Sequence, residues 1–143
     1  MASMNASIVP SRRAVLGSGL AAGAATVLVA CGSGTSAEPS IPASGTGTVA
    51  TTTAHLPVGA ASQVKVGGKG YLLFRPAEDK VLAYTAVCTH QGCTVGIGTD
   101  DFACPCHGSR FSREDGSATH GPAEKPLARF PAKVDGDNIL IYV

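Results

Sequence analysis

Two short stretches of the sequence place cysteine and histidine close together. The first is Cys88-Thr89-His90-Gln91-Gly92-Cys93, and the second is Cys104-Pro105-Cys106-His107-Gly108-Ser109. Each stretch offers a thiolate and an imidazole within reach of one metal centre. This ligand set is borderline-soft, so it suits zinc or iron–sulfur rather than magnesium or calcium. The sequence therefore predicts a metal or iron–sulfur site held by two loops.

A mononuclear zinc site with two cysteines and two histidines is the simpler alternative. Zinc sites of that kind favour C-x₂₋₄-C pairs on each side, so the spacing here favours an iron–sulfur centre. Colour distinguishes the two, because a zinc protein is colourless whereas an iron–sulfur cluster absorbs visible light.

The pattern C-T-H-x-G-C followed by C-P-C-H-G-S strongly resembles the Rieske proteins of the cytochrome bc1 and b6f type, over roughly residues 60 to 143. The resemblance implies one [2Fe-2S] cluster, with Cys88 and Cys104 on one iron and His90 and His107 on the other. Replacing two thiolates by neutral histidines raises the reduction potential, because less negative charge opposes reduction. We therefore expect a one-electron carrier of high potential.

The same resemblance assigns the other conspicuous residues of this region. It implies a disulfide between Cys93 and Cys106, which fits an oxidising, extracytoplasmic compartment. It also implies that Ser109 donates its hydroxyl to a bridging sulfide, and that a loop around Pro122 shields the cluster. Both features would tune the potential.

Three departures from the family pattern stand out. Gln91 follows His90 where respiratory members usually have an apolar residue, and Phe111 stands where a tyrosine often donates a hydrogen bond to a ligand sulfur. The interval from Cys88 to Cys104 is a few residues shorter than usual. Losing the tyrosine hydroxyl removes one charge-assisted hydrogen bond, so it predicts a lower potential.

The elements that carry these loops are predicted to be β-strands. Short alternating or β-branched runs occupy residues 63–66, 71–75, 81–87, 130–134 and 139–143. Turn residues at 67–70 and 135–138 separate them, and no ten-residue stretch has helical spacing free of Gly or Pro. We predict an all-β antiparallel sandwich or small barrel of the Rieske type over 57–143, with cluster-binding loops over 88–126.

The N-terminal residues are predicted to direct export. Arg12 and Arg13 precede an uncharged run over 14–30, which resembles a twin-arginine signal peptide. The end of that run resembles a lipoprotein cleavage site, with Cys31 as the acylated residue. An uncleaved helical anchor is the alternative, although seventeen uncharged residues are short for a membrane span. Residues 31–56 then read as the lipidated cysteine and a flexible Gly/Ser/Thr/Pro linker.

Charge and context narrow the expected role. From Cys31 onward the chain has 9 Lys+Arg against 10 Asp+Glu, so it does not have the basic character of a nucleic-acid binder. We expect a membrane-tethered subunit of a quinol:cytochrome c chain, on the extracytoplasmic face of a bacterial membrane. The alternative is a stand-alone carrier or an oxidase small subunit of the arsenite oxidase kind. Either would be an electron-transfer protein rather than a self-contained enzyme, with redox proteins as partners.

Overall fold

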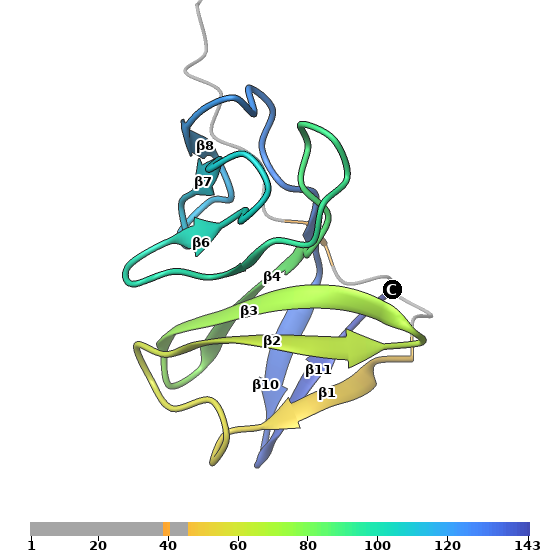
Figure 1. Cartoon of the computed structure of the whole chain (residues 1–143). Helices are drawn as coiled ribbons and strands as arrows, with labels where there is room; N and C mark the ends of the chain where they lie inside the picture. The colour runs from red at the N-terminus through yellow and green to blue at the C-terminus, as the bar shows by residue number, and fades with distance from the viewer. Residues whose placement is uncertain (1–38, 41–45) are drawn as a thin grey trace, which may run out of the picture. The chain divides into compact units, whose positions relative to one another are not determined.

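The computed structural model describes residues 39–40 and 46–143, within the compact unit Gly34–Val143. These residues contain β-strands and no helix, so the predicted all-β class is confirmed (Figure 1). None of them forms an apolar helix of membrane-spanning length. The strands are β1 (Thr48–Thr52), β2 (Ala61–Val66), β3 (Lys69–Ala77), β4 (Lys80–Thr85), β5 (Gly96–Ile97), β6 (Phe102–Ala103), β7 (Arg110–Phe111), β8 (Ala118–His120), β9 (Arg129–Phe130), β10 (Ala132–Asp135) and β11 (Asn138–Ile141).

The strands form three antiparallel sheets. The first has the order β1-β11-β10, the second β2-β3-β4-β9 and the third β5-β6-β7-β8. The third sheet is built from strands of two or three residues and holds the region that the sequence predicted to be loops. Antiparallel neighbours joined by short turns account for most of this connectivity.

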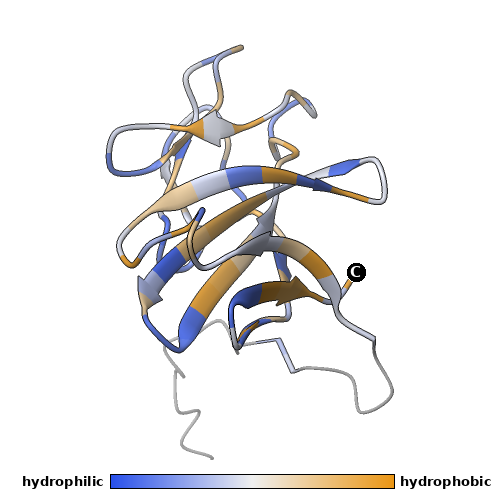
Figure 2. Ribbon diagram, turned by 90° about the horizontal axis from the view of Figure 1, so that it is seen from below, coloured by the Kyte–Doolittle hydropathy of each residue, from blue (hydrophilic) through white to orange (hydrophobic). Residues whose placement is uncertain are grey.

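The second sheet is buried on both faces. Successive side chains of a strand point to opposite sides, so Tyr71 and Leu73 of β3 enter one hydrophobic core while Leu72 and Phe74 enter the other. Residues 81–84 of β4 divide in the same way. Full burial of each large apolar side chain contributes about 1.5–3 kcal/mol. Figure 2 shows hydrophobic stretches along the strands and hydrophilic residues at several turns.

One of the two cores connects the second sheet to the Cys/His loops. Besides residues of β3 and β4 it contains Phe102 and Phe111 of the third sheet. Cys88 and Cys104, the first residues of the two loops, belong to the same core and are only 3% and 2% exposed. The packing of the central sheet therefore fixes the base of both loops.

Proline divides one predicted strand between two sheets. The run 130–134 was predicted as a single strand, but Phe130 ends β9 in the second sheet and Ala132 begins β10 in the first. Pro131 between them has no N–H to donate to a ladder. Its carbonyl still accepts a hydrogen bond from the Tyr142 N–H at 2.9 Å.

The first strand corrects a predicted boundary. β1 lies inside the stretch 31–56 that composition predicts to be a linker, and it pairs with β11 at the other end of the chain. Residues 48–56 are therefore part of the folded domain, and the prediction of a flexible linker is wrong for them. Composition missed the strand because TVATT is half-exposed, and its partner lies some ninety residues away in the sequence. The remainder of the predicted linker and the signal region lie largely outside the described residues.

Arg75 holds the connection between β1 and β2 in place. Its side chain is 9% exposed, and its guanidinium donates hydrogen bonds to the carbonyls of Leu56 at 3.2 Å and Glu78 at 2.8 Å. A longer bond of 3.4 Å reaches the carbonyl of Thr53. The bond to the Leu56 carbonyl is buried, and this carbonyl needs such a partner because water cannot reach it.

We expect Arg75→Met to lower the free energy of unfolding by about 2 kcal/mol, because the substitution keeps the aliphatic stem but leaves carbonyls without donors. Urea unfolding followed by circular dichroism measures the change at matched cofactor content. Lys80→Met on the same β3–β4 hairpin is the matched control, since Lys80 is exposed. Equal losses in both variants would contradict this role for Arg75.

Candidate metal centre

The two Cys/His loops have the same backbone construction. In residues 88–93 and again in 104–109, the N–H of the first residue donates to the carbonyl of the sixth, at 2.8 Å in each loop. The N–H of the fifth residue donates to the carbonyl of the first, at 2.9 and 3.1 Å. That fifth residue is Gly92 or Gly108, with φ of 75° and 79°, a conformation that other residues rarely adopt. The glycines recurring in the sequence pattern are thus explained by the turn.

A third turn of the chain repeats this frame without cysteine or histidine. In residues 112–117 the N–H of Ser112 donates to the Ser117 carbonyl at 2.9 Å, and the Gly116 N–H donates to the Ser112 carbonyl at 3.0 Å. Gly116 also has a positive φ. The frame therefore shapes a hairpin, and the other two copies differ from this one by their cysteine and histidine side chains.

Two free thiols lie at the base of the loops. Cys88 and Cys104 are both buried, and neither belongs to a disulfide. Burial raises the pKa of the Cys88 thiol, but hydrogen bonds outweigh that effect and bring the pKa below its ordinary value. They come from the backbone of His90 and Gln91 and from the side chains of Cys104 and Ser109. The surroundings thus favour the thiolate, which is the form that binds metals.

The two imidazole rings of the same loops lie next to each other. The ring centroids of His90 and His107 are 4.9 Å apart, and the rings stand edge to face. The Nδ1 atom of His90 is buried and has no hydrogen-bond partner among the described residues. An orphaned buried ring nitrogen is costly unless it binds something. Two thiols and two adjacent imidazoles are the donor set that a [2Fe-2S] cluster with both cysteine and histidine ligands needs.

The remaining two cysteines of the loops are joined to each other. Cys93 and Cys106 form a disulfide across a sequence separation of 13 residues, with their Cα atoms 6.5 Å apart. The Sγ atoms of both lie within 4.8 Å of the Sγ of Cys104. Since the disulfide sulfurs have no free thiolate, Cys88 and Cys104 are the cysteines available to a metal.

A third segment, residues 121–126, covers the site. The Ala123 N–H donates to the buried Ser109 hydroxyl oxygen at 3.0 Å, and the Thr89 hydroxyl donates to the Lys125 carbonyl at 2.7 Å. A cavity of about 270 Å³ lies between this segment and the first loop, lined by Thr89, His90, Pro122, Ala123, Glu124 and Lys125. The segment is thus tied to both hairpins.

Ser109 and Pro122 are predicted from the sequence as residues that tune the site, but Thr89 is not. The Thr89 side chain is fixed by a backbone carbonyl thirty-six residues away. No local pattern indicates such a contact. The one available signal was its position between a cysteine and a histidine of the first loop.

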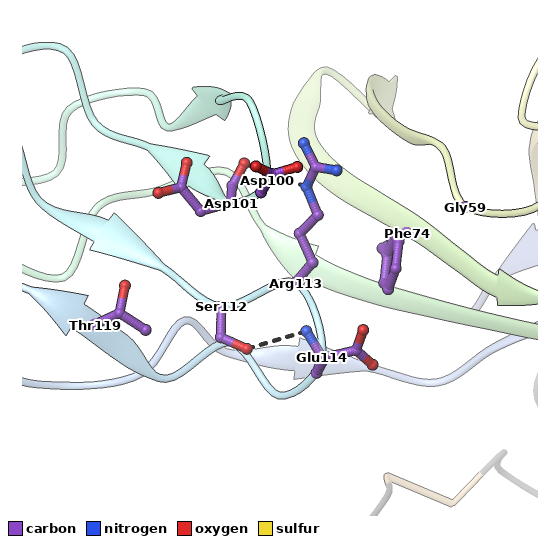
Figure 3. A pocket seen from close by; sticks show the side chains of 8 residues that line it. All are labelled: Gly59, Phe74, Asp100, Asp101, Ser112, Arg113, Glu114 and Thr119. Carbon is purple, nitrogen blue, oxygen red and sulfur yellow. Dashed lines mark hydrogen bonds between the residues drawn. The ribbon is translucent and has the colours of Figure 1, made fainter.

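A further cavity lies away from the Cys/His loops. It measures about 450 Å³ and is shown in Figure 3, lined by Gly59, Phe74, Asp100, Asp101, Ser112, Arg113, Glu114 and Thr119. Arg113 donates hydrogen bonds to the carbonyls of Gly98 and Thr99 at 2.8 and 3.0 Å. Arg110 pairs with Asp101 at 2.6 Å. Both arginines beside the second loop therefore serve intramolecular contacts.

Comparison with known proteins agrees with this geometry. The iron-sulfur subunit of the cytochrome b6-f complex of Chlorobaculum thiosulfatiphilum is 38% identical over 98 residues, which are 61% of this chain and 52% of that protein. The corresponding subunit of Gloeobacter violaceus is 50% identical over 58 residues, or 39% and 31% of the two chains. The chain thus spans about half the length, or less, of these curated relatives.

Solved structures are also similar to this chain. The cyanobacterial plasma membrane Rieske protein from Synechocystis PCC 6803 is 27% identical with a TM-score of 0.59, covering 67% of this chain and 99% of that one. A chain of a hyperthermophilic respiratory Complex III is 26% identical with a TM-score of 0.53, covering 64% and 72%. The family model of the Rieske [2Fe-2S] domain matches residues 47–131. Because this match covers more than half of the chain and includes both hairpin loops, the protein belongs to the Rieske [2Fe-2S] domain family, of the cytochrome bc1/b6f type, and has that family's [2Fe-2S] cluster as its cofactor.

Proposed function

We propose that Cys88 and Cys104 bind one iron of the [2Fe-2S] cluster and that His90 and His107 bind the other. The observation that carries this assignment is that the two equivalent hairpins together supply two free, buried thiols and two adjacent imidazoles. The unpartnered, buried Nδ1 of His90 supports it further. A cluster bound there would accept and release one electron.

The surrounding residues have separate tasks in this proposal. Burial of Cys88 and Cys104 keeps water from the thiolate-bound side. His107 is exposed, so a redox partner can approach the imidazole side closely. The disulfide and the segment around Pro122 keep the two loops together. In this proposal the side chains of the site bind and shield the cluster and take no part in making or breaking bonds of a substrate. The protein then acts as an electron carrier.

We further propose that this carrier is tethered to the extracytoplasmic face of a bacterial membrane through acylated Cys31, after export directed by Arg12 and Arg13. These residues lie outside the described part of the chain, so the support is the sequence pattern. Intact-mass measurement on a membrane extract tests it. A chain that begins at Cys31 and carries acyl groups is expected, and an unacylated chain beginning before Ala30 would refute it.

The role in electron flow that we propose is that of a subunit in a quinol:cytochrome c chain. The relatives named as cytochrome b6-f subunits support it. The test is a potentiometric titration of the visible absorbance of the full-length protein at pH 7, after iron and acid-labile sulfide have been counted. Rieske clusters range from roughly −150 to +300 mV. Bleaching near the upper end is expected, and bleaching only near the lower end would contradict the respiratory role.

A second candidate is a stand-alone carrier or the small subunit of an oxidase. The polarity of the loop tips favours it. Gln91 is exposed at the tip of the first loop. The large hydrophobic residues exposed on the described surface all lie outside the three loops around the site, namely Val49, Val58, Val87, Ile97 and Val143. For this candidate we expect a water-soluble redox protein to reduce the purified protein. Quinol together with a quinol-oxidising membrane complex is expected not to reduce it.

The hydroxyl of Ser109 is proposed to tune the potential. Its oxygen accepts a hydrogen bond from the Ala123 N–H, and it contacts the Cys88 thiol. The hydroxyl proton is therefore free to stabilise negative charge on the sulfur side of the cluster. A hydrogen bond to a charged group contributes about 1.5–3 kcal/mol, and the share that grows on reduction raises the potential.

We expect Ser109→Ala to lower the reduction potential by several tens of millivolts while the cluster remains bound. Protein-film voltammetry measures the shift. Ser117→Ala is the matched control, because Ser117 holds the same sixth position in the equivalent turn that has no cysteine. An unchanged potential in Ser109→Ala would remove this tuning role.

A further inference from the structure

Three sulfur atoms of the site lie close together, and a small movement of the Cys104 side chain would bring its sulfur into contact with the disulfide. The Sγ atoms of Cys93, Cys104 and Cys106 are all within 4.8 Å of one another. Two of them form the disulfide, and the third is a free thiol. A thiolate next to a disulfide exchanges with it by direct attack on sulfur. Cys104 is therefore a potential nucleophile as well as a proposed ligand.

We propose that Cys104, whenever the cluster is absent, isomerises the disulfide of its own chain. The Cys104 thiol gives up its proton to water, the resulting thiolate attacks the Sγ of Cys93, a new Cys93–Cys104 bond forms, and the Cys93–Cys106 bond breaks. The electron pair of the broken bond leaves on Cys106, which takes up a proton from water. One disulfide and one thiol are present before and after, so the step needs no oxidant or reductant.

Burial determines which sulfur leaves. Cys106 is exposed, so water stabilises it as the leaving thiolate, whereas Cys93 is half-buried. A Cys93–Cys104 bond still joins the two hairpins. The opposite attack would join Cys104 to Cys106 across a single proline and would leave Cys93 as the partly buried thiolate. The product we infer is therefore the Cys93–Cys104 isomer with a surface thiol at Cys106.

The consequence is a chemical mark of cluster loss. This inference rests on the proposed role of Cys104 as a cluster ligand, because a Cys104 sulfur bound to iron cannot attack the disulfide. Loss of the cluster frees Cys104, and isomerisation then removes a ligand from the site while it exposes a reactive thiol. The cluster-free chain thus differs from the cluster-bound chain by an exposed free thiol at Cys106. It cannot bind a new cluster until the disulfide exchange is reversed.

The test compares two full-length variants that are both expected to lack the cluster. Cys88→Ser retains Cys104, and Cys104→Ser does not. Each is held at pH 8 without oxygen or reductant, quenched with acid, alkylated with N-ethylmaleimide and mapped by mass spectrometry of its peptides. We expect alkylated Cys106 and a Cys93–Cys104 cross-link in Cys88→Ser. In Cys104→Ser we expect Cys106 to remain in its disulfide with Cys93.

Wild-type protein stripped of iron by a chelator provides a second measurement that does not depend on a substitution. Its Cys106 is expected to become alkylated with time, whereas the loaded protein keeps Cys106 unmodified. Persistence of the Cys93–Cys106 bond in both Cys88→Ser and the stripped chain would overturn the inference, as would alkylation of Cys106 in Cys104→Ser. Iron content of the same variants tests the ligand assignment separately, so the two failures can be told apart.

Discussion

Leucine in place of His90 or His107 is expected to remove bound iron and sulfide from the full-length chain, whereas leucine in place of His55 or His120 is expected to leave both bound. The chain has four histidines, and only two stand in the Cys/His loops. The Nδ1 atom of His90 is buried without a partner, while His55 pairs with the Thr52 hydroxyl at 2.9 Å on the exposed surface. Each of these histidines would supply one of the four protein–iron bonds of the proposed centre, and leucine has no atom that can replace it, so we expect the cluster to be lost.

Iron and acid-labile sulfide per chain, together with the visible spectrum, measure this outcome. Circular dichroism and the presence of the Cys93–Cys106 disulfide show whether each variant has folded. Cluster retention in His90→Leu would disprove the assignment of that ligand. A colourless wild-type protein that binds one zinc per chain would instead favour the Cys₂His₂ zinc alternative, in spite of the family match.

Removal of the disulfide is expected to have the second-largest effect. The double variant Cys93→Ser/Cys106→Ser should lose about 3 kcal/mol of unfolding free energy, because a cross-link over a loop of this length restricts the unfolded chain to about that extent. For a domain stabilised by a net 5–15 kcal/mol, this is a large fraction. We also expect faster loss of the cluster, since the bond holds the two hairpins side by side.

Urea unfolding of the double variant and the wild type, compared in the same cofactor state, measures the stability. Replacing both cysteines together avoids leaving an unpaired thiol that is able to form a wrong disulfide. Thr99→Ser is a suitable control, because Thr99 is an exposed residue of a neighbouring turn and its change should stay within about 0.5 kcal/mol. Equal stability of the double variant and the wild type would show that the loops are held by packing alone.

The sequence predicted those elements whose cause is local. The runs at 71–75 and 81–87 became β3 and β4, and the turns at 67–70 and 135–138 became hairpins, because glycine and alternation act within a few residues. Elements with distant causes were missed. β1 depends on pairing with β11, and the short strands of the third sheet are too brief to show a period.

The features of the candidate site also divide into those with a local sequence pattern and those that depend on distant contacts. Cysteines and histidines in a family-specific pattern identified the two loops from composition and spacing. The tie between Thr89 and the Lys125 carbonyl, and the closeness of Cys104 to the disulfide, depend on how separate hairpins pack. These contacts arise from tertiary structure, so they cannot be predicted from a single sequence.

The same six-residue backbone frame closes three hairpins of the domain and accepts different side chains in each. In residues 88–93, 104–109 and 112–117 its two hydrogen bonds join backbone to backbone, so they do not depend on what the third and fourth side chains are. One copy carries its histidine at the third place, another at the fourth, and the last carries acidic residues at both. For a protein engineer, the turn at 112–117 is thus a folded position without cysteine or histidine, where a new pair of side chains can replace Glu114 and Asp115 on the same backbone frame.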